Sequence, residues 1–271
     1  MKRILILALV IVLAAGAYVL LVKEYTAPGP SESDSSENGD EYIGEKDESL
    51  EDNDTESPDQ TPQGPATVVR TINTTENVVV LTFDAGSDRG FAASILDTLK
   101  SEGIKASFGM TGKWAETNPD IVQRISAEGH DFINHTWSHG SLTGFSTGER
   151  ALTQAERWSE LERTENFIRS LTGRTTKPFF RPPYGDYNNS VLADVGAKGY
   201  AYNVMWTVDS LGWRGLTKEE ITERVVAGTV PGAIRLFHVG EQSQDAAALP
   251  EIIRRLRGEG YTFARVSDLL E

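Results

Sequence analysis

Histidine is rare in this sequence, with four residues in 271, and three of the four lie between residues 129 and 139. His135 and His139 stand four residues apart in the segment His-Thr-Trp-Ser-His. On a helical turn or a tight loop this spacing brings two imidazoles to one side, which suits a divalent metal ion. The chain has no cysteine, so any metal must be held by His, Asp or Glu. The third of these histidines, His130, is interpreted as a structural or supporting residue.

Other side chains able to do chemistry come directly after segments that resemble buried strands. The five positions are Asp84, His135, Arg181, Asp209 and His238. Because the carboxyl ends of parallel strands meet at one rim, where α/β barrels build their active sites, we expect the five to converge. Polar residues commonly end strands, which explains each position separately but not the whole succession. For Asp84 the alternative interpretation is a carboxylate that caps the next helix. For Arg181 it is a plain structural Arg–Asp ion pair, which could be formed with Asp84 itself.

The elements that must position these residues alternate between strand and helix from about residue 66 onward. Runs of buried-type residues predict strands at 78–83, 105–110, 131–134, 178–180, 201–206, 233–237 and 261–266. Apolar residues at helical spacing predict helices at 90–102, 118–128, 147–171, 188–198, 216–226 and 246–257. Such repeated βα units predict parallel strands covered by helices, in an open α/β sheet or a (β/α) barrel.

The first 66 residues differ from the rest in composition. Residues 4–22 are free of charge and follow Lys2 and Arg3; as a helix they would span about 28 Å, close to a bilayer core of ~30 Å. This pattern favours an uncleaved membrane anchor with the bulk of the chain outside the cytoplasm. A cleaved signal peptide is the alternative, because residues 15–17 (Ala-Gly-Ala) resemble a cleavage site. Residues 24–66 are rich in Ser, Glu, Asp, Pro and Gly, which predicts a disordered linker.

The acidity of the chain belongs mostly to this linker. The formal net charge is −14, and residues 31–60 alone carry thirteen acidic residues against a single lysine. The remainder is close to neutral and has no basic run, which argues against a nucleic-acid partner. The sequence therefore predicts three parts, namely an anchor or signal peptide at 1–23, an acidic linker at 24–66 and one α/β domain at 67–271.

Five segments of that domain, taken in order, resemble the motifs of a known family. They are Thr-Phe-Asp-Ala-Gly from Thr82, Asn-His-Thr-Trp-Ser-His from Asn134, Arg-Pro-Pro-Tyr-Gly from Arg181, Asp-Ser-Leu-Gly-Trp from Asp209 and Leu-Phe-His-Val from Leu236. As a set, spread over residues 78–270, they resemble the NodB-homology polysaccharide deacetylases of carbohydrate esterase family 4. The resemblance implies a distorted (β/α) barrel and one divalent metal, with zinc favoured over cobalt or nickel. It also implies removal of N-acetyl, sometimes O-acetyl, groups from polymers such as peptidoglycan, chitin or xylan.

The resemblance also implies roles for the residues at the strand ends. Asp84 would be the general base that activates water, and Arg181 would orient it. His135 and His139 would hold the metal, and His238 would be the general acid that protonates the leaving amine. A histidine is suited to donate that proton near neutral pH.

Three further residues are implied to bind the substrate. The backbone N–H of Tyr184 would stabilise the oxyanion together with the metal. Leu236 and Trp213 would line the pocket that receives the acetyl methyl group, although Trp213, like Trp137, could equally be a packed aromatic residue.

The sequence departs from the family pattern at two places that matter. Ala85 stands where the family has a second Asp that binds the metal, so Asp84, Asp88 or water could complete the site. Gly212 stands where the family has an Asp that tunes the acid histidine, and Asp209 could partly replace it. Because the base, the arginine and the histidines are retained, we expect a catalyst from a variant subgroup.

The leading hypothesis is a metal-dependent deacetylase of cell-wall glycan, with peptidoglycan N-acetylglucosamine as the expected substrate. We expect a monomer tethered outside a bacterial membrane, or secreted if the N-terminus is cleaved. The departures at Ala85 and Gly212 motivate a second hypothesis, a catalytically inactive glycan-binding protein on a deacetylase scaffold. A third hypothesis is a hydrolase of other linear amides.

Overall fold

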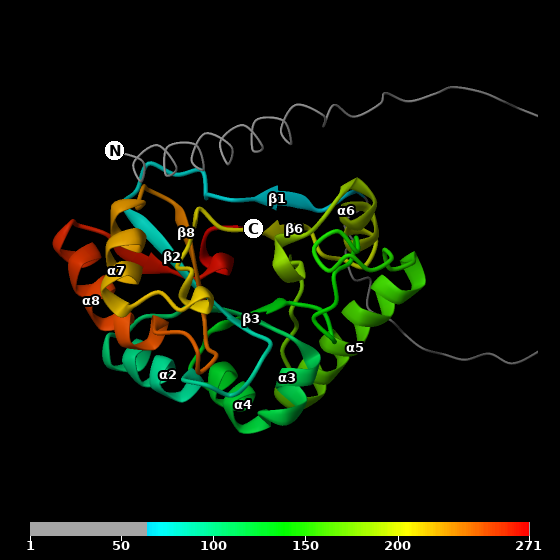
Figure 1. The fold of residues 1–271 in the computed structure, drawn as a ribbon, viewed down its shortest axis with the longest axis horizontal. Helices are drawn as coiled ribbons and strands as arrows, with labels where there is room; N and C mark the ends of the chain where they lie inside the picture. The colour runs from blue at the N-terminus through cyan, green and yellow to red at the C-terminus, as the bar shows by residue number, and fades with distance from the viewer. Residues whose placement is uncertain (1–63, 271) are drawn as a thin grey trace, which may run out of the picture. The chain divides into compact units, whose positions relative to one another are not determined.

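The computed structural model describes residues 64–270, and in them the strands form one curved, parallel sheet with helices around its outside (Figure 1). The strand order is β1-β6-β5-β4-β3-β2-β8-β7, and β9 pairs with β2 beside the main path. Every pairing between named strands is parallel. Within the described residues the two edge strands, β1 and β7, do not pair with each other. The sheet is therefore an open, distorted barrel.

The strands are short apart from the neighbouring pair β2 and β8. Their bounds are β1 Thr67–Val69, β2 Val78–Ala85, β3 Ser107–Met110, β4 Asp131–Asn134, β5 Phe179–Phe180, β6 Tyr202–Val204, β7 Val208–Asp209, β8 Ala233–His238 and β9 Thr262–Ala264. The helices are α2 Ala92–Ser101, α3 Gly112–Thr117, α4 Pro119–Ala127, α5 Gln154–Thr172, α6 Asn189–Gly196, α7 Lys218–Ala227 and α8 Asp245–Gly258.

Strand β2, which pairs with β3, β8 and β9, is buried along its whole length, as its unbroken apolar run predicts. Side chains alternate between the two faces of a strand. Val79, Leu81 and Phe83 pack into the larger core beneath the helices, whereas Val80 joins a smaller core on the opposite, inner face of the sheet. The same alternation places Asp84 on the inner face, at the carboxyl end of the strand.

The predicted strands are all present, with shifts of a few residues at their ends. The predicted helix at 147–171 is wrong in its first part, because α5 begins at Gln154. Thr153 supplies the N-cap, and its backbone and side chain form a capping box with Glu156. The short strands β1 and β7 and the helix α3 were not predicted, because they are too brief to show a periodic pattern.

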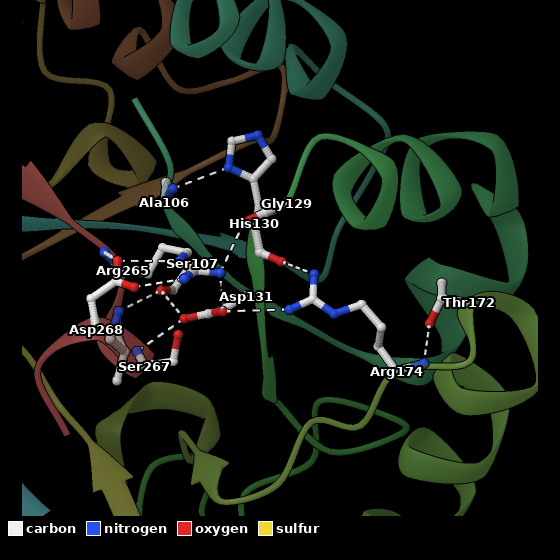
Figure 2. A network of polar contacts seen from close by, with 11 residues as sticks. Ala106, Ser107, Gly129, His130, Asp131, Thr172, Arg174, Arg265, Ser267 and Asp268 are labelled. Carbon is white, nitrogen blue, oxygen red and sulfur yellow. Dashed lines mark hydrogen bonds and ion pairs between the residues drawn. The ribbon is translucent and has the colours of Figure 1, made fainter. Parts of the chain in front are cut away.

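The amino end of β4 is tied to the C-terminal segment of the domain by the polar contacts in Figure 2. The buried carboxylate of Asp131 accepts a hydrogen bond from the backbone N–H of Ser267 at 3.0 Å and lies 3.5 Å from the Arg265 guanidinium. The neighbouring His130 is also buried, and its Nδ1 accepts the backbone N–H of Ala106 at 3.0 Å. Burial lowers the pKa of His130 to about 4, so this imidazole is neutral and structural, as predicted.

The predicted anchor at 1–23 and nearly all of the predicted linker at 24–66 lie outside the described residues. Between residues 64 and 270, no helix is long and apolar enough to cross a membrane.

Candidate active site

The carboxylate at the end of β2 is fixed by one arginine. Arg181 Nη1 donates to Asp84 Oδ1 at 2.7 Å. The guanidinium is fully buried, and Nε also donates to the carbonyl oxygen of Val204 at 2.7 Å, while Nη2 donates to Thr82 Oγ1 at 3.0 Å. These bonds hold the guanidinium in one plane against the inner face of the sheet. Asp84 is therefore presented in a single orientation by a charge-assisted hydrogen bond.

The charges around Asp84 keep it ionised. Burial acts to raise the pKa of this carboxyl group, but the Arg181 guanidinium, followed by the imidazoles of His135 and His238, outweighs it. The net result is a pKa below the ordinary value of 3.8. The carboxylate is thus available to accept a proton at neutral pH.

A glycine on the adjacent strand makes room for this carboxylate. Gly109 of β3 pairs with Asp84 of β2 in the ladder. A Cβ at position 109 would approach Asp84 Oδ1 far more closely than the 3.0 Å that real Cβ atoms keep. Any larger residue at this position would therefore displace the carboxylate.

The two histidines of the second motif lie together beside Asp84. The centroids of the His135 and His139 rings are 5.0 Å apart, with the rings at 73° to each other. His135 Nδ1 lies 2.8 Å from the carbonyl oxygen of Arg181, which can only accept a hydrogen bond, so Nδ1 carries the proton. The lone pair of His135 Nε2 then faces Asp84 Oδ2, at 3.6 Å.

Both imidazoles are neutral in this environment. Burial lowers the pKa of His135 and lowers that of His139 to about 4. The backbone of His139 has a positive φ of 64°, and its N–H donates to Thr136 Oγ1 at 3.2 Å. Neutral imidazole with one nitrogen held by a carbonyl oxygen is the usual form of a metal-binding histidine.

The protein donors fit a divalent ion held by two imidazoles. Nowhere in residues 64–270 do three His, Asp or Glu side chains form a group that could hold a metal ion. Asp88, a candidate for the missing third ligand, lines the same cavity, but its Oδ1 accepts the backbone N–H of Glu241 at 2.9 Å. Beside the imidazoles, the carboxylate of Asp84 is the nearest protein oxygen donor that the contacts show, at 3.6 Å from His135 Nε2.

His238 reaches the same place from the neighbouring strand. It is the last residue of β8 and lies directly opposite Asp84 in the ladder. Burial alone would lower the pKa of this imidazole. The acidic neighbours Asp245, Asp84 and Asp209 outweigh burial and raise the pKa above 6.5. His238 therefore holds its proton more readily than an ordinary histidine does.

A cavity of about 510 Å³ connects these groups. Its lining contains every site residue predicted from the sequence except Arg181, which lies beneath Asp84; the lining includes Asp84, His135, His139, Tyr184, Asp209, Trp213, Leu236 and His238. The predicted convergence of the five strand-end residues is thus what the structure shows.

Two half-exposed aromatic side chains stand at this cavity. Tyr184 is 53% exposed and packs edge-on against His139, with ring centroids 4.9 Å apart. Trp213 is also 53% exposed, and its Nε1 donates to Asp209 Oδ2 at 3.0 Å. Asp209 therefore orients Trp213 through a direct hydrogen bond, whereas it acts on His238 only as one of several nearby charges. Exposed aromatic faces held in place are suited to contact a sugar ring.

Sequence reasoning missed two residues that shape the site. The sequence gives no sign of the role of Gly109, because the need for a residue without a Cβ arises only from Asp84 on the adjacent strand. Asp245 lies seven residues after His238 and belongs to none of the five motifs. Its only signal was an acidic residue at the start of a predicted helix, which is common for electrostatic reasons.

Comparison with known proteins points to one family. The profile of the polysaccharide deacetylase family matches residues 71–203. A peptidoglycan-N-acetylglucosamine deacetylase of Bacillus cereus is 34% identical over 196 residues, which cover 71% of this chain and 68% of that protein.

Solved structures agree with this similarity. The crystal structure of the Bc1960 peptidoglycan N-acetylglucosamine deacetylase, in complex with a naphthalenyl N-oxidanyl-benzamide, superimposes with a TM-score of 0.68 at 32% identity, covering 74% of this chain and 92% of that one. A second solved structure is that of a mutant, with restored enzymatic activity, of BA3943, a family 4 carbohydrate esterase pseudoenzyme of Bacillus anthracis. It has a TM-score of 0.68 at 25% identity and covers 76% of this chain and 71% of that one.

Proposed function

Because the chain belongs to the polysaccharide deacetylase family and is thereby a polysaccharide N-deacetylase, we propose that it removes acetyl groups from N-acetylglucosamine in peptidoglycan. The identity of 34% to a Bacillus cereus enzyme of that specificity supports this choice of polymer. The observation that carries the proposal is the convergence of Asp84, the His135–His139 pair and His238 on one cavity.

Each of these residues has a role that its surroundings support. Asp84, held ionised by Arg181, accepts a proton from the attacking water. His238, whose pKa is raised, donates a proton to the nitrogen of the amide as the C–N bond breaks. The products are acetate and a free amino group on the sugar. Leu236 and Trp213 contact the acetyl methyl group, and the Tyr184 backbone N–H binds the carbonyl oxygen.

His135 and His139 would hold the divalent metal, for which we propose zinc, with cobalt or nickel as substitutes. When bound, such a metal polarises the acetyl carbonyl and lowers the pKa of water. Position 85 supplies no carboxylate as a third ligand beside the two imidazoles. We therefore expect the metal to bind more weakly and to exchange more easily than in a three-ligand site.

The test is acetate release from peptidoglycan and from N-acetylglucosamine oligomers, after chelation and addition of zinc, cobalt or nickel. We expect release with at least one metal and its loss in Asp84→Asn. Simple N-acetylated amides, tested in parallel, separate a sugar deacetylase from a general amide hydrolase. No release from any acetylated glycan with any metal would contradict the proposal.

The second candidate is a glycan-binding protein without activity. The loss of a carboxylate at Ala85 favours it, and a pseudoenzyme of similar fold exists. In that case wild type and Asp84→Asn would bind peptidoglycan equally and neither would release acetate.

We also propose that the domain works outside the cytoplasm, at the membrane of a bacterial cell. The support is the uncharged run at residues 4–22 after two basic residues. Protease treatment of intact cells would degrade a surface-exposed domain and spare a cytoplasmic one.

A further inference from the structure

The space beside Gly212 is occupied by the side chains of Ser243 and Asp245. Gly212 lies just before Trp213, which lines the cavity. A Cβ at position 212 would lie 2.7 Å from Asp245 Oδ1 and closer still to Ser243 Oγ. The hydroxyl of Ser243 and the carboxylate of Asp245 thus fill the room that a side chain at 212 would need.

Three hydrogen bonds hold Asp245 in this position. It is the first residue of α8 and is fully buried. Its Oδ2 accepts the backbone N–H of His238 at 2.7 Å and the hydroxyl of Ser210 at 3.0 Å. Its own backbone N–H donates to Ser243 Oγ at 3.1 Å. The carboxylate is therefore fixed to the backbone of the residue that is expected to act as the acid.

Two buried polar atoms at this place have no hydrogen-bond partner. They are Nδ1 of His238 and Oδ1 of Asp245. Leaving a buried donor or acceptor unpaired costs about 1–3 kcal/mol, so such atoms are rare in native proteins. His238 Nδ1 lies 3.8 Å from Asp245 Oδ2, so a small rotation of the ring would bring a donor and an acceptor into bonding range.

We propose that Asp245 is the positioning residue of His238 and accepts a hydrogen bond from its Nδ1–H. The carboxylate then fixes the tautomer of the neutral ring and stabilises its protonated form. The proton to be transferred resides on Nε2, the nitrogen that Asp245 does not hold. This inference rests on the proposed function only for the statement that His238 donates a proton during the reaction.

Asp209 was the candidate for this role from the sequence, but its carboxylate is engaged elsewhere. Its Oδ1 accepts the backbone N–H of Leu211 at 2.9 Å, and its Oδ2 accepts Trp213 Nε1 at 3.0 Å. The geometry therefore assigns Asp209 to the aromatic wall of the cavity and Asp245 to the histidine.

The alternative for Asp245 is a purely structural role, since an acidic residue in the first turn stabilises a helix. A structural role predicts a loss of stability in Asp245→Asn and no specific change at His238. A positioning role predicts a change in the tautomer and pKa of His238 itself. The two interpretations therefore differ in what they predict for one imidazole.

The experiment is NMR of the full chain labelled in its histidine rings, which number only four. In the wild type, neutral His238 should carry its proton on Nδ1; a proton on Nε2 instead would overturn the proposal. In Asp245→Asn this preference should be lost, and the pKa of His238 should fall by about one pH unit. An unchanged tautomer and pKa in the folded variant would also overturn it.

Two variants serve as controls. Ser210→Ala removes one hydrogen bond to the same carboxylate but keeps its charge, so the tautomer of His238 should not change. Asp209→Asn removes a charge near His238 without touching Nδ1, so its effect on the pKa should be smaller. The other groups whose charges act on His238 are Asp84 and the two imidazoles, His135 and His139, and all variants retain them.

Activity gives a separate readout. In Asp245→Asn, kcat should fall by about 10-fold or more with little change in KM. The substitution affects the proton donor His238 and leaves the residues that contact the sugar unchanged. If wild type releases no acetate, the proposed function fails, but the NMR result still decides whether Asp245 positions His238.

Discussion

The substitution Gly109→Ala tests how the site is built, because it adds one methyl group and removes no polar atom. The new Cβ would overlap Asp84 Oδ1, which is bonded to Arg181 Nη1 at 2.7 Å. To restore van der Waals contact the carboxylate must move by roughly 1 Å, and a displacement of this size at a reacting group can lower the rate about 100-fold. Overpacking a buried site also lowers the free energy of unfolding by about 1–3 kcal/mol.

The assay is kcat/KM for acetate release, measured beside urea unfolding of the same sample. Gly258→Ala is the matched control, since a Cβ at that position meets nothing within 4 Å. We expect the control to retain full activity and the Gly109→Ala variant to lose most of it while still folded. Wild-type kcat/KM in a folded Gly109→Ala protein would show that the position of Asp84 is not set by this contact.

Three further predictions follow from the charges and contacts. First, kcat/KM should fall as pH rises and His238 loses its proton. Because the pKa of His238 is raised, the midpoint of this fall should lie above pH 6.5, and a midpoint below 6.5 would contradict the prediction. By linkage, the stability that this group contributes is fully present below pH 6.5 and is lost as pH rises through the folded pKa. Second, a chelator should abolish activity, and added zinc should restore it without refolding, which can be followed by circular dichroism. Third, Asp131→Asn should lower the free energy of unfolding by about 1–3 kcal/mol but leave kcat/KM unchanged, because Asp131 begins β4 whereas His135 follows its end. A large loss of activity in a folded variant would refute that separation.

The convergence of the five strand-end residues was predictable from the sequence, because each lies at or just after the carboxyl end of a predicted strand. Asp84 and His238 are an example. Each comes at the end of a buried run, and parallel pairing of β2 with β8 places them directly opposite each other. The general rule for parallel sheets was therefore enough to bring them together.

Other features depend on contacts between distant segments and have no local signal. Gly109 and Asp245 act through the space beside a residue on another element, and no periodicity encodes that. Likewise, the start of α5 is set by a hydrogen-bonded cap at Thr153, whereas polar and apolar residues continue in helix-like order upstream of it. The sequence pattern therefore placed the start of this helix too early.

The pairing of β2 has a consequence for how the chain reaches its native state. Along one edge, β2 is joined to β3 near its carboxyl end and to β9 near its amino end, and β8 covers the other edge. Two of these three partners lie at least about 150 residues further along the chain, a separation that slows folding because long loops must close first. During synthesis Asp84 and His238 cannot meet until β8 has emerged, and Val78–Val80 keep an unpaired edge until β9 follows. A nascent chain of this protein would therefore keep that edge exposed, and prone to aggregation, until β9 was made.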